Sequence, residues 1–428
     1  MRTTHRFHTN NPEIFKLQLL QWAQQFTAVV WLDSNGHTAF HNRFNGVLAA
    51  DEFTVIETDA STGFDKLSEY QQQTKDWIFG YLGYDLKNDT ENLTSQNYDG
   101  LKLPDLYFFQ PKRIIEIIGE ELIFNYLNMV EDEAEDDFTA ICAIKIGTKP
   151  LNNGLVIKER ISKKEYLQKA NKMLSHILRG DIYEANLCME FYAEGTIHPL
   201  ATFNSLNTIS KAPNSAFLKR KNTYALCASP ERYIRKNNDV VISQPIKGTA
   251  PRNTSAAIDE AAKNELSQNQ KERAENVMIV DLVRNDLSKV AQKGSVRVTE
   301  LCKVYSFEQV HQMISTVESK VSQTLQPVSV LKATFPMGSM TGAPKISAMK
   351  IIEVLEETKR GLYSGAIGYF TPKGDFDFNV VIRSIVYNEE EQYCSFSVGS
   401  AITAKADPEL EYNECLLKAA ALRHVLEK

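Results

Sequence analysis

The sequence lacks long hydrophobic runs and has no excess of positive charge. No stretch of eighteen consecutive apolar residues occurs in its 428 residues, so we expect no membrane-spanning helix. The first five residues lead into polar sequence rather than into the apolar core of a secretion signal. Lys plus Arg number 48 against 54 Asp plus Glu, and this net charge of −6 disfavours binding to nucleic acid or to an anionic membrane. We therefore expect a cytoplasmic protein.

Metal-binding and redox patterns are also missing. The six cysteines are scattered without a CxxC pair, which argues against a zinc site or a redox motif and favours buried free thiols. His37 and His41 stand four apart, but Gly36 just before them favours a turn over a metal-binding helix. None of the cysteines lies in the Gly-x-Cys-x-Gly elbow of a glutaminase, so ammonia derived from glutamine would require another chain.

The hydrophobic and charged residues that are present indicate a soluble globular protein of more than one structural region. Hydrophobic residues make up 43% and charged residues 24% of a chain long enough to bury a large core. The first third predicts short strands with few helices, at 26–32, 53–58, 77–84, 106–110 and 113–118. A stretch with linker composition, 147–154, separates an N-terminal, mainly β half (1–150) from a second region (151–428).

The second region predicts long helices between strand-like runs. Ser162 and Glu165 form a capping box, and apolar residues then recur at helical spacing as far as Gly180. Further helices are expected at 255–287 with an interruption near Gln268, at 344–357, and from 407 onward. The alternation of meanders and single helices predicts an α+β fold with antiparallel sheets rather than βαβ units.

Six phrases in the second region carry a resemblance to a known family. They are ASPER (228–232) with PIKGT (245–249), AEN (274–276) with MIVDLVRNDL (278–287), GSMTGAPK (338–345), YSGAIGY (363–369), NVVIRS (379–384) and DPELEYNE (407–414). In order and spacing they resemble the chorismate-utilising enzymes, which include anthranilate, aminodeoxychorismate, isochorismate and salicylate synthases. The resemblance covers about residues 155–428. It implies the fold of anthranilate synthase component I, with two large antiparallel β-sheets packed face to face, helices outside and an active-site cleft among the C-terminal elements.

Three positions point to one branch of that family. Lys247 matches a lysine of the aminodeoxychorismate synthase large subunit (component I), where anthranilate synthases carry a small residue. Glu184 stands where the water-adding isochorismate and salicylate enzymes have a lysine, and Asn276 stands where anthranilate synthases usually have a histidine. The resemblance implies amination of chorismate to 4-amino-4-deoxychorismate for 4-aminobenzoate and folate synthesis. The alternative is the large subunit (component I) of anthranilate synthase.

Two residues are candidates for catalysis. Hydroxide leaves the ring poorly unless it is protonated, and Glu231 is the candidate acid because a carboxyl in a partly apolar pocket has a raised pKa. Its alternative role is to cap a turn or to pair with Arg232. Lys247 is the candidate nucleophile at C2 of the ring, by resemblance, which requires a neutral amine and hence a pKa below about 10.4. Its alternative role is to bind a substrate carboxylate.

The resemblance also implies a magnesium site. Glu275 and Glu414 match the family's magnesium-binding glutamates, and Glu411 lies three residues before Glu414, near the same helix face. Mg²⁺ is suited to few protein oxygens, retained waters and a substrate carboxylate. The alternatives are that Glu411 and Glu414 complement a helix N-terminus, that Glu414 pairs with Lys418, and that Glu275 lies on an exposed face.

Substrate contacts and partners are implied in the same way. Tyr363 and Arg383 match ligands of a second carboxylate, together with backbone N–H groups around Gly399. An unpaired arginine is costly to bury in an otherwise apolar strand, so we expect an anion, or alternatively an internal Asp, opposite Arg383. Further hydroxyl contacts are expected from Thr249, Ser339 and Thr341. The implied partners are chorismate, ammonia and a glutamine amidotransferase subunit that forms a heterodimer with this chain.

Several residues depart from the family pattern, among them Ala250, where a basic or larger residue is common. Ser400 and Ala401 follow Gly399 where relatives usually have a glycine-rich phrase, and glycine permits close backbone approach. Gln312 stands where many relatives have a histidine, and His311 is one place earlier. Because neighbouring residues on a strand face opposite ways, we expect that His311 cannot take the place of that histidine.

Overall fold

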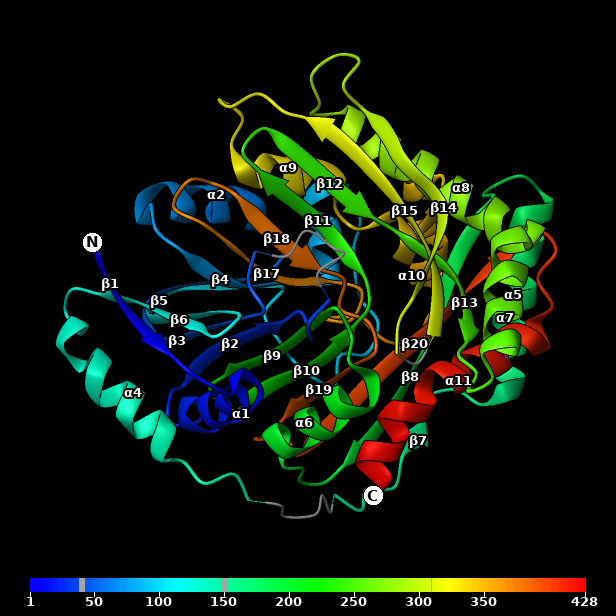
Figure 1. Ribbon diagram of the computed structural model, residues 1–428. Helices are drawn as coiled ribbons and strands as arrows, with labels where there is room; N and C mark the ends of the chain where they lie inside the picture. The colour runs from blue at the N-terminus through cyan, green and yellow to red at the C-terminus, as the bar shows by residue number, and fades with distance from the viewer. Residues whose placement is uncertain (38–42, 148–152, 309) are drawn as a thin grey trace.

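The computed structural model describes residues 1–37, 43–147, 153–308 and 310–428 (Figure 1). Most of the expected linker at 147–154 lies outside the described residues, as does His41 of the histidine pair. Within these ranges, none of the helices has the length and apolar character needed to cross a membrane. All six cysteines are free thiols and only Cys142 is exposed, which confirms the expectation of buried thiols for the other five.

The named strands pair antiparallel and form one network that branches at β5 (Leu106–Ile118). One side of β5 pairs with β3 (Gly46–Thr58) along almost its whole length. Its other side pairs first with β4 (Ile78–Leu82) and then with β6 (Glu121–Leu127). The network therefore continues from β5 as two separate arms.

The first arm extends from β3. Its strands, in spatial order, are β2 (Ala28–Asp33), β9 (Asn214–Arg220), β10 (Thr223–Ser229), β19 (Ser384–Asn388), β20 (Tyr393–Thr403) and β8 (Glu184–Glu194). Shorter pairings add β1 (Arg2–His8) to β6, and β7 (Lys158–Glu159) and β16 (Gly342–Ala343) to β8.

The second arm extends from β4. Its strands are β17 (Ala366–Phe370), β18 (Phe376–Asn379), β11 (Arg232–Asn237), β12 (Val240–Gln244) and β15 (Val310–Lys320), with β13 (Ile246–Pro251) and β14 (Arg297–Ser306) also on β15. Strands from both sides of residue 150 pair with each other in both arms, β2 with β9 and β4 with β17. The division at residue 150 itself stays a prediction.

The two arms pack face to face over a shared apolar core. Val30 and Leu218 from the first arm belong to the same buried cluster as Phe79 and Tyr369 from the second. Burial of such side chains is the main favourable term in folding, at about 25 cal/mol per Å² of apolar surface. This arrangement confirms the predicted α+β fold with two antiparallel sheets packed face to face, and β5 joins the two sheets into one network.

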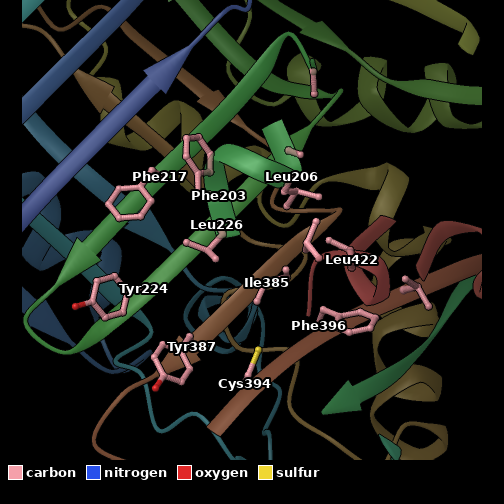
Figure 2. Close-up of a cluster of buried hydrophobic side chains, with 14 of the residues drawn as sticks. Phe203, Leu206, Phe217, Tyr224, Leu226, Ile385, Tyr387, Cys394, Phe396 and Leu422 are labelled. Atoms are coloured by element: carbon pink, nitrogen blue, oxygen red, sulfur yellow. The ribbon is translucent and has the colours of Figure 1, made fainter. Parts of the chain in front are cut away.

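Helices cover the outer faces of both arms (Figure 1). On the first arm these are α1 (Pro12–Ala23), α4 (Ala134–Ala143), α5 (Lys163–Leu178), α6 (Pro199–Ser210), α10 (Lys345–Leu355) and α11 (Pro408–Glu427). On the second arm they are α2 (Gly63–Thr74), α8 (Gln270–Ser288) and α9 (Pro327–Thr334). Figure 2 shows part of the packing of helices on the first arm, where Phe203 of α6 and Leu422 of α11 lie over Phe217, Leu226 and Phe396 of the sheet.

The predicted helices of the second region are confirmed. Ser162 caps α5 with the predicted capping box. The long helix expected at 255–287 is two helices, α7 (Ala256–Gln268) and α8, because Asn269 ends the first and its side chain accepts a hydrogen bond from the backbone N–H of Glu272 in the second. Helices α10 and α11 follow Pro344 and Asp407 as expected.

The first third differs from the prediction at several places, and β1 and α2 were not among the expected elements. The strands expected at 106–110 and 113–118 are one strand, because Pro111 lies at a bulge opposite β3, where the ladder needs no N–H from it. Helix α1 was not predicted, although Asn11 and Pro12 are a common N-cap and first residue of a helix.

Candidate active site

Lys247 lies on a β-bulge in β13. Ile246 pairs with Ile314 and Thr249 with Gln312, so three steps along β13 correspond to two along β15. Gly248 has a φ of +90°, which glycine adopts readily and other residues rarely do. The bulge therefore explains why the glycine follows the lysine, and it redirects the Lys247 side chain away from the regular alternation of the strand.

The charges around Lys247 are mostly negative. Burial acts to lower the pKa of its amine, but the carboxylates of four glutamates outweigh burial and raise that pKa above its usual value; they are Glu184, Glu275, Glu414 and Glu231. The expectation of a lowered pKa is therefore wrong for the protein without ligands, because the sequence did not indicate that four carboxylates from separate segments surround this amine. The lysine is protonated in this state.

Glu231 has the electrostatics expected of a general acid. Its side chain is 4% exposed, and burial raises the pKa of its carboxyl to about 7, while Ser339 and Lys247 act in the opposite direction. A carboxyl with this pKa is partly protonated at neutral pH. The alternative that Glu231 pairs with Arg232 is not found, because the Arg232 guanidinium donates to Asp377 and Gln244 instead.

Ser339 lies beside Glu231 in the 3₁₀ turn η4 (Gly338–Met340). Its hydroxyl is buried, lies close enough to influence the Glu231 carboxyl, and makes no hydrogen bond of normal geometry within the described part of the chain. Thr341, just after the turn, has a hydroxyl that donates to the carbonyls of Met337 and Gly338, each at 3.2 Å. Ser339 is thus available to a substrate, whereas the Thr341 hydroxyl is used within the turn.

Glu414 belongs to α11, and Lys418 links its carboxylate to β20, the strand that carries Gly399. Lys418 Nζ lies 2.6 Å from the Glu414 carboxylate and donates to the Gly399 carbonyl at 2.9 Å. The Glu414 side chain is 45% exposed, so its desolvation is only partial and acts to raise its pKa, but Lys418, Lys247 and Lys271 lower the pKa overall. Glu414 is therefore ionised, and the predicted pair with Lys418 is present together with proximity to Lys247.

Glu275 on α8 has an unsatisfied buried oxygen. Its Oε1 atom makes no hydrogen bond to the described residues, and the Lys271 amine lies 4.0 Å away. Burial raises the pKa of Glu275 to about 7. Its side chain is buried, so the exposed-face alternative is wrong.

The third predicted metal ligand, Glu411, is engaged by protein groups. Lys271 Nζ donates to its carboxylate at 3.2 Å, and the Ser400 hydroxyl donates to its other oxygen. The departure at Ser400 therefore has a structural role in holding Glu411. At the neighbouring Gly399 a Cβ atom would lie 2.6 Å from the Cys188 sulfur, so glycine is required there.

These carboxylates fit a cation, although they do not form a complete metal cage. The described residues contain no group of three or more His, Cys, Asp or Glu side chains placed to hold a metal ion. Mg²⁺ usually keeps several waters and takes only one or two carboxylates, and the orphaned oxygen of Glu275 would gain a partner from it. Magnesium at Glu275 and Glu414 stays a prediction.

The Arg383 guanidinium has no side-chain partner among the residues that the structure describes. No carboxylate of the described residues pairs with it, so the alternative of an internal Asp is not found, and burial lowers the pKa of its guanidinium. The prediction that Arg383 lies within a strand is wrong. Arg383 lies in the break between β18 and β19, because its φ of +50° interrupts the ladder. Its carbonyl accepts a hydrogen bond from Ala228, near Glu231. A half-buried unpaired cation at this place is suited to an anion.

Cys188 links Tyr363 to Gly399, because it contacts both residues. The Cys188 thiol donates to the Tyr363 hydroxyl at 3.8 Å, and Cys188 is the cross-strand neighbour of Gly399. Burial raises the pKa of Tyr363 well above its usual value, so the hydroxyl keeps its proton and can donate to an acceptor. Thr249, in contrast, is exposed on β13.

Gln312, which departs from the family pattern, and its neighbour His311 face different ways on β15. His311 Nε2 lies 3.0 Å from the Asp259 carboxylate and its Nδ1 2.9 Å from the Ser306 hydroxyl. Gln312 is buried on the opposite side and its amide oxygen has no hydrogen-bond partner in the described ranges. This confirms that His311 does not replace the missing histidine.

Asn276 attaches α8 to the sheet. Its side-chain oxygen accepts a hydrogen bond from the Ser315 hydroxyl, and its side-chain nitrogen donates to the Met313 carbonyl at 3.5 Å. Glu275, the next residue before it, is thereby fixed relative to β15. Asn276 is a positioning residue in this structure.

Two features of the site were not identified from the sequence. Glu184 was interpreted only as the absence of a lysine, yet it is 2% exposed, its Oε2 has no hydrogen-bond partner among the described residues, and burial raises its pKa. Arg360 forms a buried ion pair with Glu356 at 2.7 Å and donates to the carbonyls of Met340 and Asn186. The spacing of four residues between Glu356 and Arg360 was the available signal for this pair.

Comparison with known proteins agrees with the resemblance. A family model described as "chorismate binding enzyme" matches residues 26–424. The chain is 31% identical over 420 residues to aminodeoxychorismate synthase component 1 of Klebsiella aerogenes, covering 90% of this chain and 91% of the relative. It is 34% identical over 363 residues to anthranilate synthase component 1 of Thermus thermophilus, covering 82% and 77%.

Longer relatives and solved structures also match. The chain is 41% identical over 271 residues to the probable chloroplastic aminodeoxychorismate synthase of Oryza sativa, covering 62% of this chain but only 30% of that relative. The crystal structure of anthranilate synthase component I from Streptococcus pneumoniae superposes with a TM-score of 0.77 at 26% identity, covering 90% of this chain and 93% of that one. The anthranilate synthase component I fold is thereby confirmed.

The pKa of Glu231 predicts a pH-dependent stability difference. Its carboxyl has a pKa of about 7 when folded and 4.5 when free, so the unfolded chain releases a proton that the folded chain keeps, and stability falls as pH rises from about 4.5 to 7. Glu231→Gln removes this loss. We expect the variant to match the wild type near pH 4.5 and to exceed its unfolding free energy by about 3 kcal/mol at pH 8.

Urea unfolding at pH 4.5 and pH 8 measures this difference. The exposed Glu265→Gln, which makes the same chemical change, is the control and should show no such dependence. An equal stability difference for Glu231→Gln at both pH values would contradict the raised pKa.

Proposed function

Since the chain belongs to the chorismate binding enzyme family, we propose that it is an aminodeoxychorismate synthase component 1, which converts chorismate and ammonia to 4-amino-4-deoxychorismate and water. The single observation that supports this best is the pair formed by Lys247 and Glu231: a lysine on a bulge and a carboxyl with a pKa of about 7, each acting on the charge of the other. The product would serve 4-aminobenzoate and folate synthesis.

Glu231 acts as the acid for the leaving hydroxyl. Its protonated carboxyl gives a proton to the oxygen on C4, so that water leaves instead of hydroxide. Ser339 lies beside this carboxyl and acts to lower its pKa. After the transfer the Glu231 carboxylate is stabilised by the nearby Lys247 and Lys418.

Lys247 acts as the nucleophile at C2, for which its amine must first lose a proton. Glu184 is the suited acceptor, because it is the strongest negative influence on Lys247, its own pKa is raised by burial, and one of its oxygens lacks a partner in the described chain. Transfer of the proton converts an ammonium and a buried carboxylate into two neutral groups, which a water-free site favours. This transfer explains how Lys247 can become a neutral amine although its pKa is raised in the protein without ligands.

The two substrate carboxylates have separate binding groups. Arg383 and the Tyr363 hydroxyl supply a cation and a donor for one of them, with Gly399 beside Tyr363. Glu275 and Glu414 would hold Mg²⁺, which supplies the positive charge that the other carboxylate needs. Among the remaining predicted contacts, Ser339 lies beside Glu231, whereas Thr249 is exposed and the Thr341 hydroxyl is bonded within its own turn.

The alternative function is that of anthranilate synthase component 1. This alternative is supported by the similarity of the chain to the Thermus thermophilus relative and to the Streptococcus pneumoniae structure. It differs by elimination of pyruvate after amination. The lysine at position 247, with the surrounding carboxylates, favours the route in which the amine adds to the ring and the enolpyruvyl group is kept.

A second chain would supply the ammonia. Relatives are named "component 1", and this sequence has no glutaminase elbow around any of its six cysteines. Ammonium predominates over ammonia at neutral pH, so a glutamine amidotransferase partner that releases ammonia next to the site is the expected arrangement.

Product analysis with the purified chain tests this function. We expect chorismate with high ammonium at alkaline pH to yield 4-amino-4-deoxychorismate by mass spectrometry, with no pyruvate and no anthranilate fluorescence. Glutamine alone should give no product, and addition of a glutamine amidotransferase subunit should restore it. Stoichiometric pyruvate with anthranilate would instead establish the alternative, and glutamine hydrolysis by this chain alone would contradict the need for a partner.

Lys247→Ala tests the nucleophile. The variant removes attack at C2 but leaves Arg383 and the glutamates, so we expect kcat with ammonium to fall about a hundredfold or more while chorismate affinity changes little. Steady-state rates and equilibrium binding of chorismate measure the two effects. The exposed Lys303→Ala serves as control, and near-normal turnover by Lys247→Ala would rule out the covalent route.

Glu275→Gln and Glu414→Gln test the metal site. If both carboxylates serve one ion, each single variant should weaken the dependence of the rate on magnesium, and the double variant should lose much less than the sum of the two single losses. Titration of the rate with MgCl₂ at saturating chorismate measures this. Additive losses that do not depend on magnesium would assign both glutamates a structural role.

A further inference from the structure

Arg360 and Glu356 form an ion pair that is almost completely buried. Their side chains are 2% and 5% exposed, and the guanidinium donates to both carboxylate oxygens, at 2.7 and 2.9 Å. Neither residue is among the four glutamates around Lys247 or the groups that the proposed function assigns to the substrate. Replacement of such a pair by apolar side chains often leaves stability unchanged or raises it, so the pair points to a role in geometry rather than in stability.

One side of the pair holds the backbone of β8. Glu356 accepts a hydrogen bond from the Cys188 backbone N–H at 2.9 Å, and Arg360 donates to the Asn186 carbonyl at 2.9 Å. Both backbone groups lie on the strand that begins at Glu184, the proposed proton acceptor for the nucleophile. The pair therefore fixes this strand close to the end that carries Glu184.

The other side of the pair holds the turn η4. Arg360 donates to the carbonyl of Met340, which follows Ser339 in this turn. Ser339 lies beside Glu231 and acts to lower the pKa of its carboxyl. One guanidinium thus connects the strand of the proposed proton acceptor to the turn beside the proposed acid.

The N-terminal part of the chain holds the guanidinium in this direction. The centre of the Tyr84 ring lies 4.5 Å from the guanidinium carbon, within the range of a cation–π contact. Asp85 accepts a hydrogen bond at 3.2 Å from the backbone N–H of Gly361, the residue after Arg360. The planar guanidinium offers five N–H donors, which lets one side chain reach a carboxylate and two carbonyls at once. The single ammonium of a lysine cannot reproduce this geometry.

We propose that Arg360, together with Glu356, is a positioning residue that sets the separation between the Glu184 end and the Glu231 end of the site, an inference that rests on the roles of these two glutamates in the proposed function. The two ends belong to different arms of the sheet network, because Glu184 lies on β8 of the first arm and Glu231 directly precedes β11 of the second. Proton transfer at both ends of one bound ring requires that their separation match the ring. A small error in that separation slows turnover without removing any group that touches the substrate.

Infrared titration of the Glu231 carboxyl tests this role without substrate. The readout is the carbonyl band of the protonated acid, identified by its absence in Glu231→Gln, with a midpoint at about pH 7 in the wild type. Arg360→Lys keeps the positive charge but releases η4, so Ser339 should lose its effect on Glu231. We expect the midpoint to rise by about half a pH unit. Lys247 and Lys418, the charged groups that act on Glu231, are unchanged in this variant.

Ser339→Ala identifies the contact through which Arg360 acts. This variant should give the same rise of the Glu231 midpoint, because it removes the hydroxyl directly. The double variant of Arg360→Lys and Ser339→Ala should exceed neither single variant, because both changes act through one contact.

Steady-state kinetics give a second readout. We expect kcat with chorismate and ammonium to fall about tenfold in Arg360→Lys, while chorismate affinity stays within about threefold of wild type because Arg383 and the metal-site glutamates are unchanged. Arg113→Lys is the matched control, since Arg113 is a buried arginine of β5 that pairs with three carboxylates. It should lower stability to urea and leave both kcat and the Glu231 midpoint unchanged.

Glu356→Gln keeps the test decisive if Arg360→Lys fails to fold. It should also raise the Glu231 midpoint, whereas loss of a nearby negative charge alone would lower it. An unchanged midpoint in the folded variants, a shift equal to that of Arg113→Lys, or additive shifts of Arg360→Lys and Ser339→Ala would overturn the positioning role. The infrared readout needs no turnover, so absence of aminodeoxychorismate with the wild-type chain would refute the proposed function separately.

Discussion

The site depends on one electrostatic constraint, the gathering of four carboxylates, three of them buried, around a single ammonium group. Unpaired buried charges are costly, and the charge on Lys247 offsets the repulsion among Glu184, Glu231, Glu275 and Glu414. These glutamates come from β8, from the segment before β11, from α8 and from α11, which are far apart in the sequence. The antiparallel network and the helices on its outer faces bring them together, so the fold and the charge balance are coupled.

The same balance gives chemically identical side chains different protonation states. Burial raises the pKa of Glu231 and of Glu275 to about 7, whereas nearby lysines lower that of Glu414. A carboxyl that keeps a proton is suited to acid catalysis, and a carboxylate that has lost it is suited to a cation. Binding of a divalent cation at Glu275 would release its proton, so metal affinity and pH are linked at this site.

The sequence predicted what depends on local pattern and not what depends on distant contacts. The capping box at Ser162 and the break between α7 and α8 followed from local spacing, and the structure agrees with both. The acid role of Glu231 followed from the family resemblance, and the structure agrees with the raised pKa that this role needs. The direction of the pKa shift of Lys247 could not be predicted, because its four partners lie in four segments. The same reason applies to Arg360, whose carbonyl partners lie twenty and more residues away.

The raised pKa of Lys247 in the absence of ligands is compatible with a nucleophilic role. Burial is the largest influence on this amine and acts to lower its pKa, but the surrounding carboxylates outweigh it. Any bound group that neutralises those carboxylates removes the opposing influence, and any substrate that displaces water strengthens the effect of burial. Under the proposed function, both changes would accompany binding of Mg²⁺ and chorismate. The amine would therefore become reactive only when chorismate is in place, and the resting protein would keep its lysine protected as an ammonium.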